Sequence, residues 1–164
     1  MRTRFKAQCR INTPLGPMTL AATASGLAGA WFDAQSHHPG ELDAPTDADD
    51  PVLVQAAREL GEYFAGTRQV FDIALDPQGT AFQHRVWRAL RQIDRGRLNT
   101  YGAIAKQLGR PAGARAVGAA VGRNPLSVIV PCHRVVGRDG SLTGYAGGLQ
   151  RKVALLQLEG AATA

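Results

Sequence analysis

Short runs that alternate between apolar and polar residues open the chain and predict β-strands. Three of them, FKAQCRI, PMTLAAT and LAGAWFD, are separated by the turn signals TPLGP and ASG. Residues 35–50 then form an acidic, polar stretch with few large apolar side chains. Such a composition is typical of a mobile loop.

A helical period follows the acidic loop. Asp50 suits the N-terminal cap of this helix, and Pro51 suits its first turn. Apolar residues recur on one helical face as far as Gly66, and the run VFDIALD beyond it predicts a further strand. His37 and His38 have no other metal ligand at a useful spacing, so we expect a solvated loop there. This half of the chain is therefore expected to be a scaffold.

The second half of the chain predicts three helices. Thr80 and Gln83 form a capping box for the first, which we expect to bury an apolar stripe with Trp87 on its flank. TYGAIAKQLG, capped by Thr100, predicts the second helix. The short turn RPAG joins it to a third, ARAVGAAVG, which is the spacing of a helix-turn-helix. The stripe of the first helix comprises Phe82, Val86, Leu90 and Ile93.

The third helix has one face made almost entirely of small residues. Val117 and Val121 would point towards a core, whereas the opposite face carries Arg115, Gly118, Ala119 and Gly122. Each glycine costs a helix about 1 kcal/mol relative to alanine, so a close approach to a partner must offset this cost. The minor groove of DNA is such a partner. Tight packing inside the protein is the alternative, but an unpaired buried arginine would oppose it.

Charge is distributed unevenly along the 164 residues. Residues 1–80 hold 6 basic and 10 acidic side chains, whereas residues 81–164 hold 13 and 3. The basic half favours a polyanionic partner, although surface charge that only aids solubility is an equal alternative. The start of the chain does not resemble a signal peptide, and no apolar run reaches the length of a membrane span. We expect a cytoplasmic protein.

The stretch VIVPCHRVVG holds Cys132, one of two cysteines in the chain. The apolar, β-branched run before it should be extended and buried, which would deliver Cys132 into a basic, exposed turn suited to a reactive thiol. His133 is the obvious base. Because adjacent side chains rarely face each other, it would act through a bridging water, or the turn would be irregular. A histidine base needs a third group to orient it. Glu159 is one of only three acids in this half, with Asp94 and Asp139.

The region from Phe82 to Gly160 resembles the methylated-DNA-protein-cysteine methyltransferases, or 6-O-alkylguanine-DNA alkyltransferases. The PCHR core, the upstream Asn-Pro, the downstream segment TGYAGG and the terminal LQLEG carry the resemblance, together with the helix-turn-helix. TPLGPMTLAAT is similar to the family's N-terminal hairpin. The resemblance implies an α+β fold. A small ribonuclease H-like α/β domain over residues 1–78 would precede a mainly helical, winged-helix-like domain over residues 79–164.

The resemblance also implies a reaction. The protein would bind double-stranded DNA through the minor groove, flip out an alkylated guanine and transfer the alkyl group from O6 to Cys132. Alkylated O4 of thymine is a second expected substrate. The thioether is inert, so each molecule would act once, as a monomer and without a cofactor. By the same resemblance, His133 deprotonates the thiol through a bridging water, and Glu159 orients the histidine.

Further roles follow from the resemblance residue by residue. Asn124 is the turn asparagine between the recognition helix and the active-site segment, and it completes the catalytic set. Arg115 would fill the stack that the flipped base leaves. Substrate contacts are expected at Tyr101, Val135, Tyr145, Ala146 and Lys152, and further DNA contacts at Gly102, Gly118, Ala119, Gly122 and Arg138.

Two departures from the family and two alternative functions bear on this reading. Some members bind zinc near the N-terminus, but Cys9 has no partner ligands, so we expect no metal. Ala146 replaces a serine of some relatives, which removes a hydroxyl contact. A lesion-recognising or regulatory DNA-binding protein without chemistry would leave Cys132, His133 and Glu159 unexplained. A cysteine hydrolase would show turnover and need an oxyanion hole.

Overall fold

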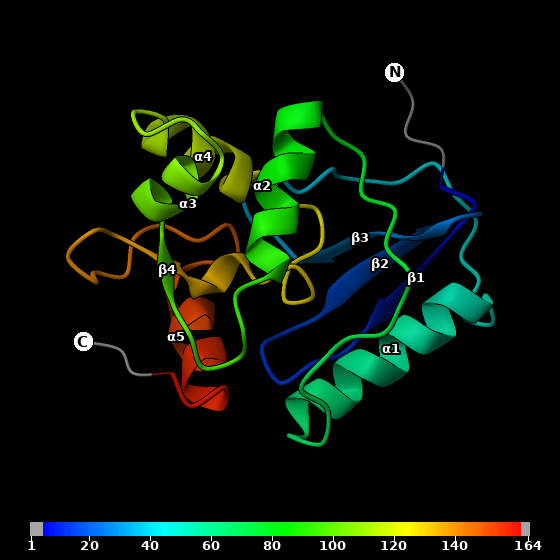
Figure 1. The fold of residues 1–164 in the computed structure, drawn as a ribbon. Coiled ribbons are helices and arrows are strands. Elements are labelled where there is room, and N and C mark those ends of the chain that lie inside the picture. The colour runs from blue at the N-terminus through cyan, green and yellow to red at the C-terminus, as the bar shows by residue number, and fades with distance from the viewer. Residues whose placement is uncertain (1–4, 162–164) are drawn as a thin grey trace. The chain divides into compact units, whose positions relative to one another are not determined.

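The computed structural model describes residues 5–161, which form two compact units (Figure 1). The first unit extends to Gln78 and also includes Pro125–Ile129. The second comprises Gly79–Asn124 and the chain from Val130 onwards. The boundary between the units falls between Gln78 and Gly79, and the segment Pro125–Ile129 groups with the first unit rather than the second.

The first unit is built on an antiparallel sheet of three strands in the order β1-β2-β3. The three predicted strands are confirmed, and helix α1 contacts all of them (Figure 1). Every residue of β3 is buried, so this strand forms the centre of the unit's core. The elements are β1 (Ala7–Ile11), β2 (Met18–Thr23), β3 (Gly26–Phe32) and α1 (Pro51–Phe64).

Helix α1 begins as its sequence predicts. Asp50 accepts hydrogen bonds from the backbone N–H groups of Val52 and Leu53, at 2.9 and 3.3 Å, and Pro51 occupies the first turn. The predicted strand VFDIALD is wrong. Only Leu75 in that run forms a bridge, with Leu27 of β3.

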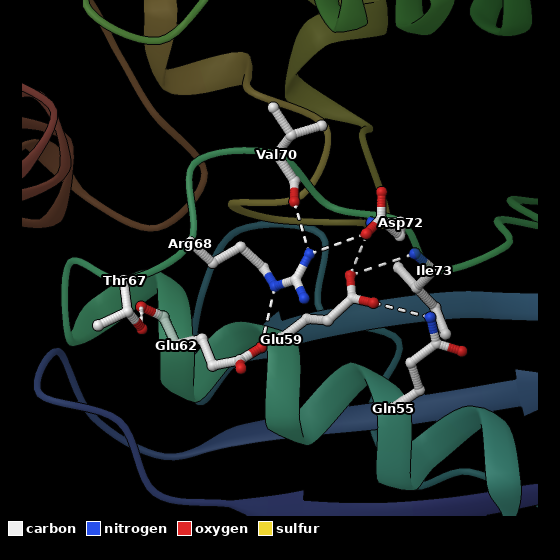
Figure 2. Close-up of polar contacts among 8 residues, drawn as sticks. All are labelled: Gln55, Glu59, Glu62, Thr67, Arg68, Val70, Asp72 and Ile73. Carbon is white, nitrogen blue, oxygen red and sulfur yellow. Dashed lines mark hydrogen bonds and ion pairs between the residues drawn. The ribbon is translucent and has the colours of Figure 1, made fainter.

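Glu59 of α1 explains why this run is not a strand. Its buried carboxylate accepts hydrogen bonds from the backbone N–H groups of Asp72 and Ile73, at 2.8 and 3.1 Å (Figure 2). It also accepts one from the side chain of Gln55 at 2.7 Å. Arg68 pairs with both Glu62 and Asp72 across the same connection. Two consecutive backbone donors in the middle of the run are therefore used by a helix side chain, and only the end of the run pairs with β3, through Ala74 and Asp76.

The segment Pro125–Ile129 lies against β3. The N–H of Ala30 donates to the carbonyl of Pro125 at 2.8 Å, and the N–H of Ser127 donates back to Ala30 at 3.0 Å. Val128 then has a φ of 74°, so the predicted extended run is wrong although its residues are buried. A β-branched residue in this left-handed region is strained, and the strain is held by the pairing with β3.

The second unit contains four helices, a single 3₁₀ turn and a two-stranded parallel sheet among the described residues. The capping box of Thr80 and Gln83 is confirmed, and Thr100 caps α3 as predicted. The elements are α2 (Ala81–Arg91), β4 (Asn99–Thr100), α3 (Tyr101–Gln107), α4 (Ala114–Gly122), η1 (Cys132–Arg134), β5 (Val135–Val136) and α5 (Leu149–Leu158). Strand β4 leads directly into α3 (Figure 1). It pairs with β5, which follows η1.

Trp87 lies in the core rather than on the flank of α2. Its ring N–H donates to the carbonyl of Ala120 in α4 at 2.9 Å, which joins the two helices. Phe82, expected to be buried, is only half-buried and lies under the guanidinium of Arg110 at 4.8 Å. No helix within residues 5–161 has the length and hydropathy to cross a membrane.

Candidate active site

Cys132 is the first residue of the 3₁₀ turn η1 and is only 3 % exposed. The expectation of an exposed turn is wrong, because this turn is packed within the second unit. Burial raises the pKa of the Cys132 thiol. A hydrogen bond from the side chain of Asn124 and the positive charge of Lys152 act in the opposite direction. The site therefore opposes the cost of burying a thiolate with a specific donor and one cation.

Asn124 lies just beyond the C-terminal end of α4 and is buried. Its Nδ2 donates to the carbonyl of Val130 at 2.8 Å, which ties the end of the helix to the residue two before Cys132. The structure thus brings Asn124 and Cys132 together, although Pro125–Ile129, which belongs to the first unit, lies between them in the chain.

His133 and Glu159 form the predicted pair. Nε2 of His133 lies 2.8 Å from Oε2 of Glu159, and both side chains are fully buried. Glu159 is the C-terminal cap residue of α5, so the end of this helix positions the carboxylate. Arg134 also binds Glu159, through Nε at 2.8 Å and Nη2 at 2.9 Å. We did not predict Arg134 as a site residue, and its place in the PCHR motif was the only available signal.

Burial holds the pKa of His133 below its usual range. Glu159 opposes this change, whereas the positive charges of Arg134 and Lys152 reinforce it. At neutral pH the imidazole is therefore neutral and able to accept a proton. Its Nδ1 is buried and has no hydrogen-bond partner within residues 5–161.

Lys152 is fully buried on α5. Its Nζ donates to the carbonyl oxygens of Val135 at 2.6 Å and Thr143 at 3.1 Å. Burial lowers the pKa of Lys152 to about 8, and Cys132 opposes that change. The hydroxyl of Thr143 donates to the Tyr101 hydroxyl at 3.1 Å. Thr143, which we did not predict, therefore joins the lysine to the first residue of α3.

Tyr145 and Ala146 lie in the segment before α5. The ring of Tyr145 meets that of His133 edge to face, with 6.4 Å between their centroids. Ala146 is half-buried, and Arg138 is exposed in the turn after β5. No group of at least three His, Cys, Asp or Glu side chains in the described part of the chain is arranged to hold a metal ion.

Comparison with known proteins matches both parts of the chain to one family. Residues 10–77 match the ribonuclease-like domain of 6-O-methylguanine DNA methyltransferase, and residues 81–161 match its DNA-binding domain. The chain belongs to this family. The resemblance seen in the sequence is thereby confirmed, together with the fold class that it implied.

Individual members of the methyltransferase family are similar over most of their length. A methylated-DNA–protein-cysteine methyltransferase of Mycobacterium bovis is 48% identical over 91% of this chain and 89% of its own. One of Methanosarcina acetivorans is 46% identical over 90% and 94%. The crystal structure of Mycobacterium tuberculosis OGT in complex with DNA has a TM-score of 0.84 and 46% identity, and covers 94% of this chain and 92% of its own.

The predicted DNA-contacting residues of this methyltransferase lie mostly on α3 and α4. Arg115 and Ala119 are exposed on α4, whereas Val117 and Val121 are buried, as the helical pattern predicted. A Cβ on Gly118 would lie 3.7 Å from the ring of Tyr101, so these two helices approach closely there. Added Cβ atoms on Gly102 and Gly122 would meet nothing within 4 Å. The face therefore combines open positions with one long cation.

Proposed function

We propose that this protein repairs DNA by moving an alkyl group from O6 of guanine to Sγ of Cys132, once per molecule. The family assignment supports the class of reaction: the protein is a DNA-repair alkyltransferase whose acceptor is one of its own cysteines. The observation that carries the choice of Cys132 is its position. The buried thiol receives a donor from Asn124 and lies in the field of Lys152, next to the His133–Glu159 pair.

The chemistry follows from these neighbours. Neutral His133 takes the thiol proton through a bridging water, and the thiolate attacks the alkyl carbon. The S–C bond forms as the C–O bond breaks, and the electron pair of that bond passes to the guanine ring. The leaving guanine becomes neutral by taking up a proton. A hydrogen bond to its oxygen would assist departure, and the backbone N–H groups near Tyr145 and Ala146 are the proposed donors.

The proposal extends to the DNA. The face of α4 would enter the minor groove of double-stranded DNA, where its small residues allow close backbone approach. Arg115 would fill the gap left by the flipped guanine, with Tyr101 and Lys152 on the substrate side and Arg138 as a further DNA contact. Alkylated thymine is a further proposed substrate. We also propose that the protein acts as a monomer in the cytoplasm without a cofactor.

Transfer of label from DNA to protein tests the reaction. Duplex DNA carrying a labelled O6-methylguanine should place one labelled methyl group on the peptide that contains Cys132, and no more. Cys132→Ala should accept none, whereas Cys9→Ala should behave as the wild type because Cys9 is a buried residue of β1. Binding without transfer would instead support a lesion-recognising protein. Repeated turnover with release of methanol would support a hydrolase.

A further inference from the structure

Glu159 receives more hydrogen-bond donors than the orientation of a histidine requires. Besides His133, the guanidinium of Arg134 contacts both carboxylate oxygens in a two-point fork, at 2.8 and 2.9 Å. The third arm of Arg134, Nη1, donates to the carbonyl of Ile93 at 2.6 Å. Arg134 is itself buried. The fork therefore holds the carboxylate in one plane, and Ile93, two residues beyond the end of α2, holds the fork.

This arrangement determines where the imidazole carries its proton. A carboxylate gripped by an arginine fork is ionised and can only accept hydrogen bonds. Nε2 of His133, 2.8 Å from Oε2 of Glu159, must therefore be the nitrogen that donates. A neutral imidazole then has its lone pair on Nδ1, the buried nitrogen without a partner in the described part of the chain.

We infer that Arg134 is a positioning residue for alkyl transfer: its fork on Glu159 keeps His133 neutral, with the free lone pair on Nδ1. This rests on the proposed role of His133 as the base. The charge balance around the imidazole supports the inference. Glu159 and Arg134 offset each other, Lys152 on α5 adds a positive charge, and Tyr145 presents its ring. Without Arg134, the carboxylate would favour a protonated imidazole, which cannot act as a base.

If Arg134 only stabilised the fold, its variants would behave differently. Loss of the arginine would then lower the melting temperature but would not change the pH at which the reaction rate falls. The experiment is therefore the single-turnover rate with free O6-benzylguanine as a function of pH, because the free base needs neither DNA binding nor flipping. The variants are Arg134→Gln, which removes the charge and the fork, and Arg134→Lys, which keeps the charge alone. Arg95→Gln is the matched control, because Arg95 donates to the Leu158 carbonyl at the same end of α5.

The expected results differ between the variants. Arg134→Gln should react at least about tenfold more slowly at neutral pH, a part of the 10²–10⁴-fold that a general base contributes. The acid limb of its pH profile should move to higher pH, since the histidine is protonated more easily. Arg134→Lys should lose rate with an acid limb close to that of the wild type. Arg95→Gln should match the wild type in both.

Two outcomes would overturn the inference, and neither depends on a variant that folds poorly. In the wild type, ¹⁵N NMR of His133 should show a neutral ring protonated at Nε2 at pH 7; protonation at Nδ1 would contradict it directly. A folded Arg134→Gln variant that has the wild-type rate and the wild-type acid limb would also contradict the inference. If the wild type itself transfers no benzyl group to Cys132, the proposed function fails instead, and the two failures are thereby distinguished.

Discussion

Nδ2 of Asn124 donates a buried 2.8 Å hydrogen bond to the carbonyl oxygen of Val130, and the same side chain also hydrogen-bonds to the Cys132 thiol. One amide therefore closes the turn that contains strained Val128 and stabilises the reactive sulfur. Structural and chemical roles are combined in a single residue, and they can be separated by measurement.

Asn124→Ala should affect both roles. Leaving the buried Val130 carbonyl without its donor should lower the free energy of unfolding by about 1–3 kcal/mol, measured by urea denaturation. The titration of the Cys132 thiol, followed by thiolate absorbance, should also move to higher pH because a donor to the sulfur is lost. Asn99→Ala is the control, since Asn99 accepts from the N–H of Thr100 in a half-buried position. A less stable variant with an unchanged thiol titration would limit Asn124 to closing the turn.

Short sequence motifs predicted those parts of the fold that depend on contacts between residues close together in the chain. Asp50 and Thr80 cap their helices through residues two or three positions away, and both caps are present. The burial of Cys132 could not be predicted in this way. It depends on how α5 and the end of α4 pack around η1, and the PCHR stretch alone suggested an exposed basic turn.

The errors also have particular physical causes. VFDIALD has the composition of a strand, but Glu59, more than ten residues earlier in the chain, accepts from the backbone N–H groups of Asp72 and Ile73 in the middle of the run. Arg134 was overlooked because a basic residue beside a histidine gives no sign that both contact one carboxylate 25 and 26 residues away. Family resemblance pointed to Glu159, which contacts His133, but a pattern of matched residues does not show that a third residue, Arg134, contacts the same carboxylate.

The buried carboxylate of Glu59 should be important for the stability of the first unit. Glu59→Leu would leave the backbone N–H groups of Asp72 and Ile73 without acceptors, and should lower the free energy of unfolding by about 2–5 kcal/mol. Glu62→Leu, on the same helix, removes only a half-buried pair with Arg68, which keeps its second partner Asp72, and should cost about 1 kcal/mol or less (Figure 2). Equal losses in thermal or urea denaturation would contradict this account of the connection.

Lys152 should affect the reaction in a pH-dependent way. Its pKa of about 8 means that the ammonium is charged below that pH and largely neutral above it. The charge favours the Cys132 thiolate, so Lys152→Met should slow transfer from free O6-benzylguanine most strongly below pH 8. The ratio of wild-type to variant rate should then fall as pH rises through about 8. A constant ratio from pH 6 to pH 9 would mean that Lys152 acts only through its bonds to Val135 and Thr143.

Arg115 is the exposed long side chain on an α4 face otherwise made of glycine and alanine. If it fills the gap left by a flipped guanine, it offsets an unstacking cost of a few kcal/mol. Arg115→Ala should therefore react about 10- to 100-fold more slowly with alkylated duplex DNA at saturating protein, a loss of about 1.4–2.7 kcal/mol. It should react normally with free O6-benzylguanine, and single-stranded DNA should fall between the two.

Two comparisons separate this role of Arg115 from the alternatives. Arg123→Ala removes an equal charge just beyond α4, and any defect from a lost phosphate contact should largely disappear at saturation or low salt. The defect of Arg115→Ala should persist there, because flipping follows binding. If Arg115→Ala slows the reactions with free base and duplex equally, the residue supports the fold or the active site, and insertion into the stack is wrong.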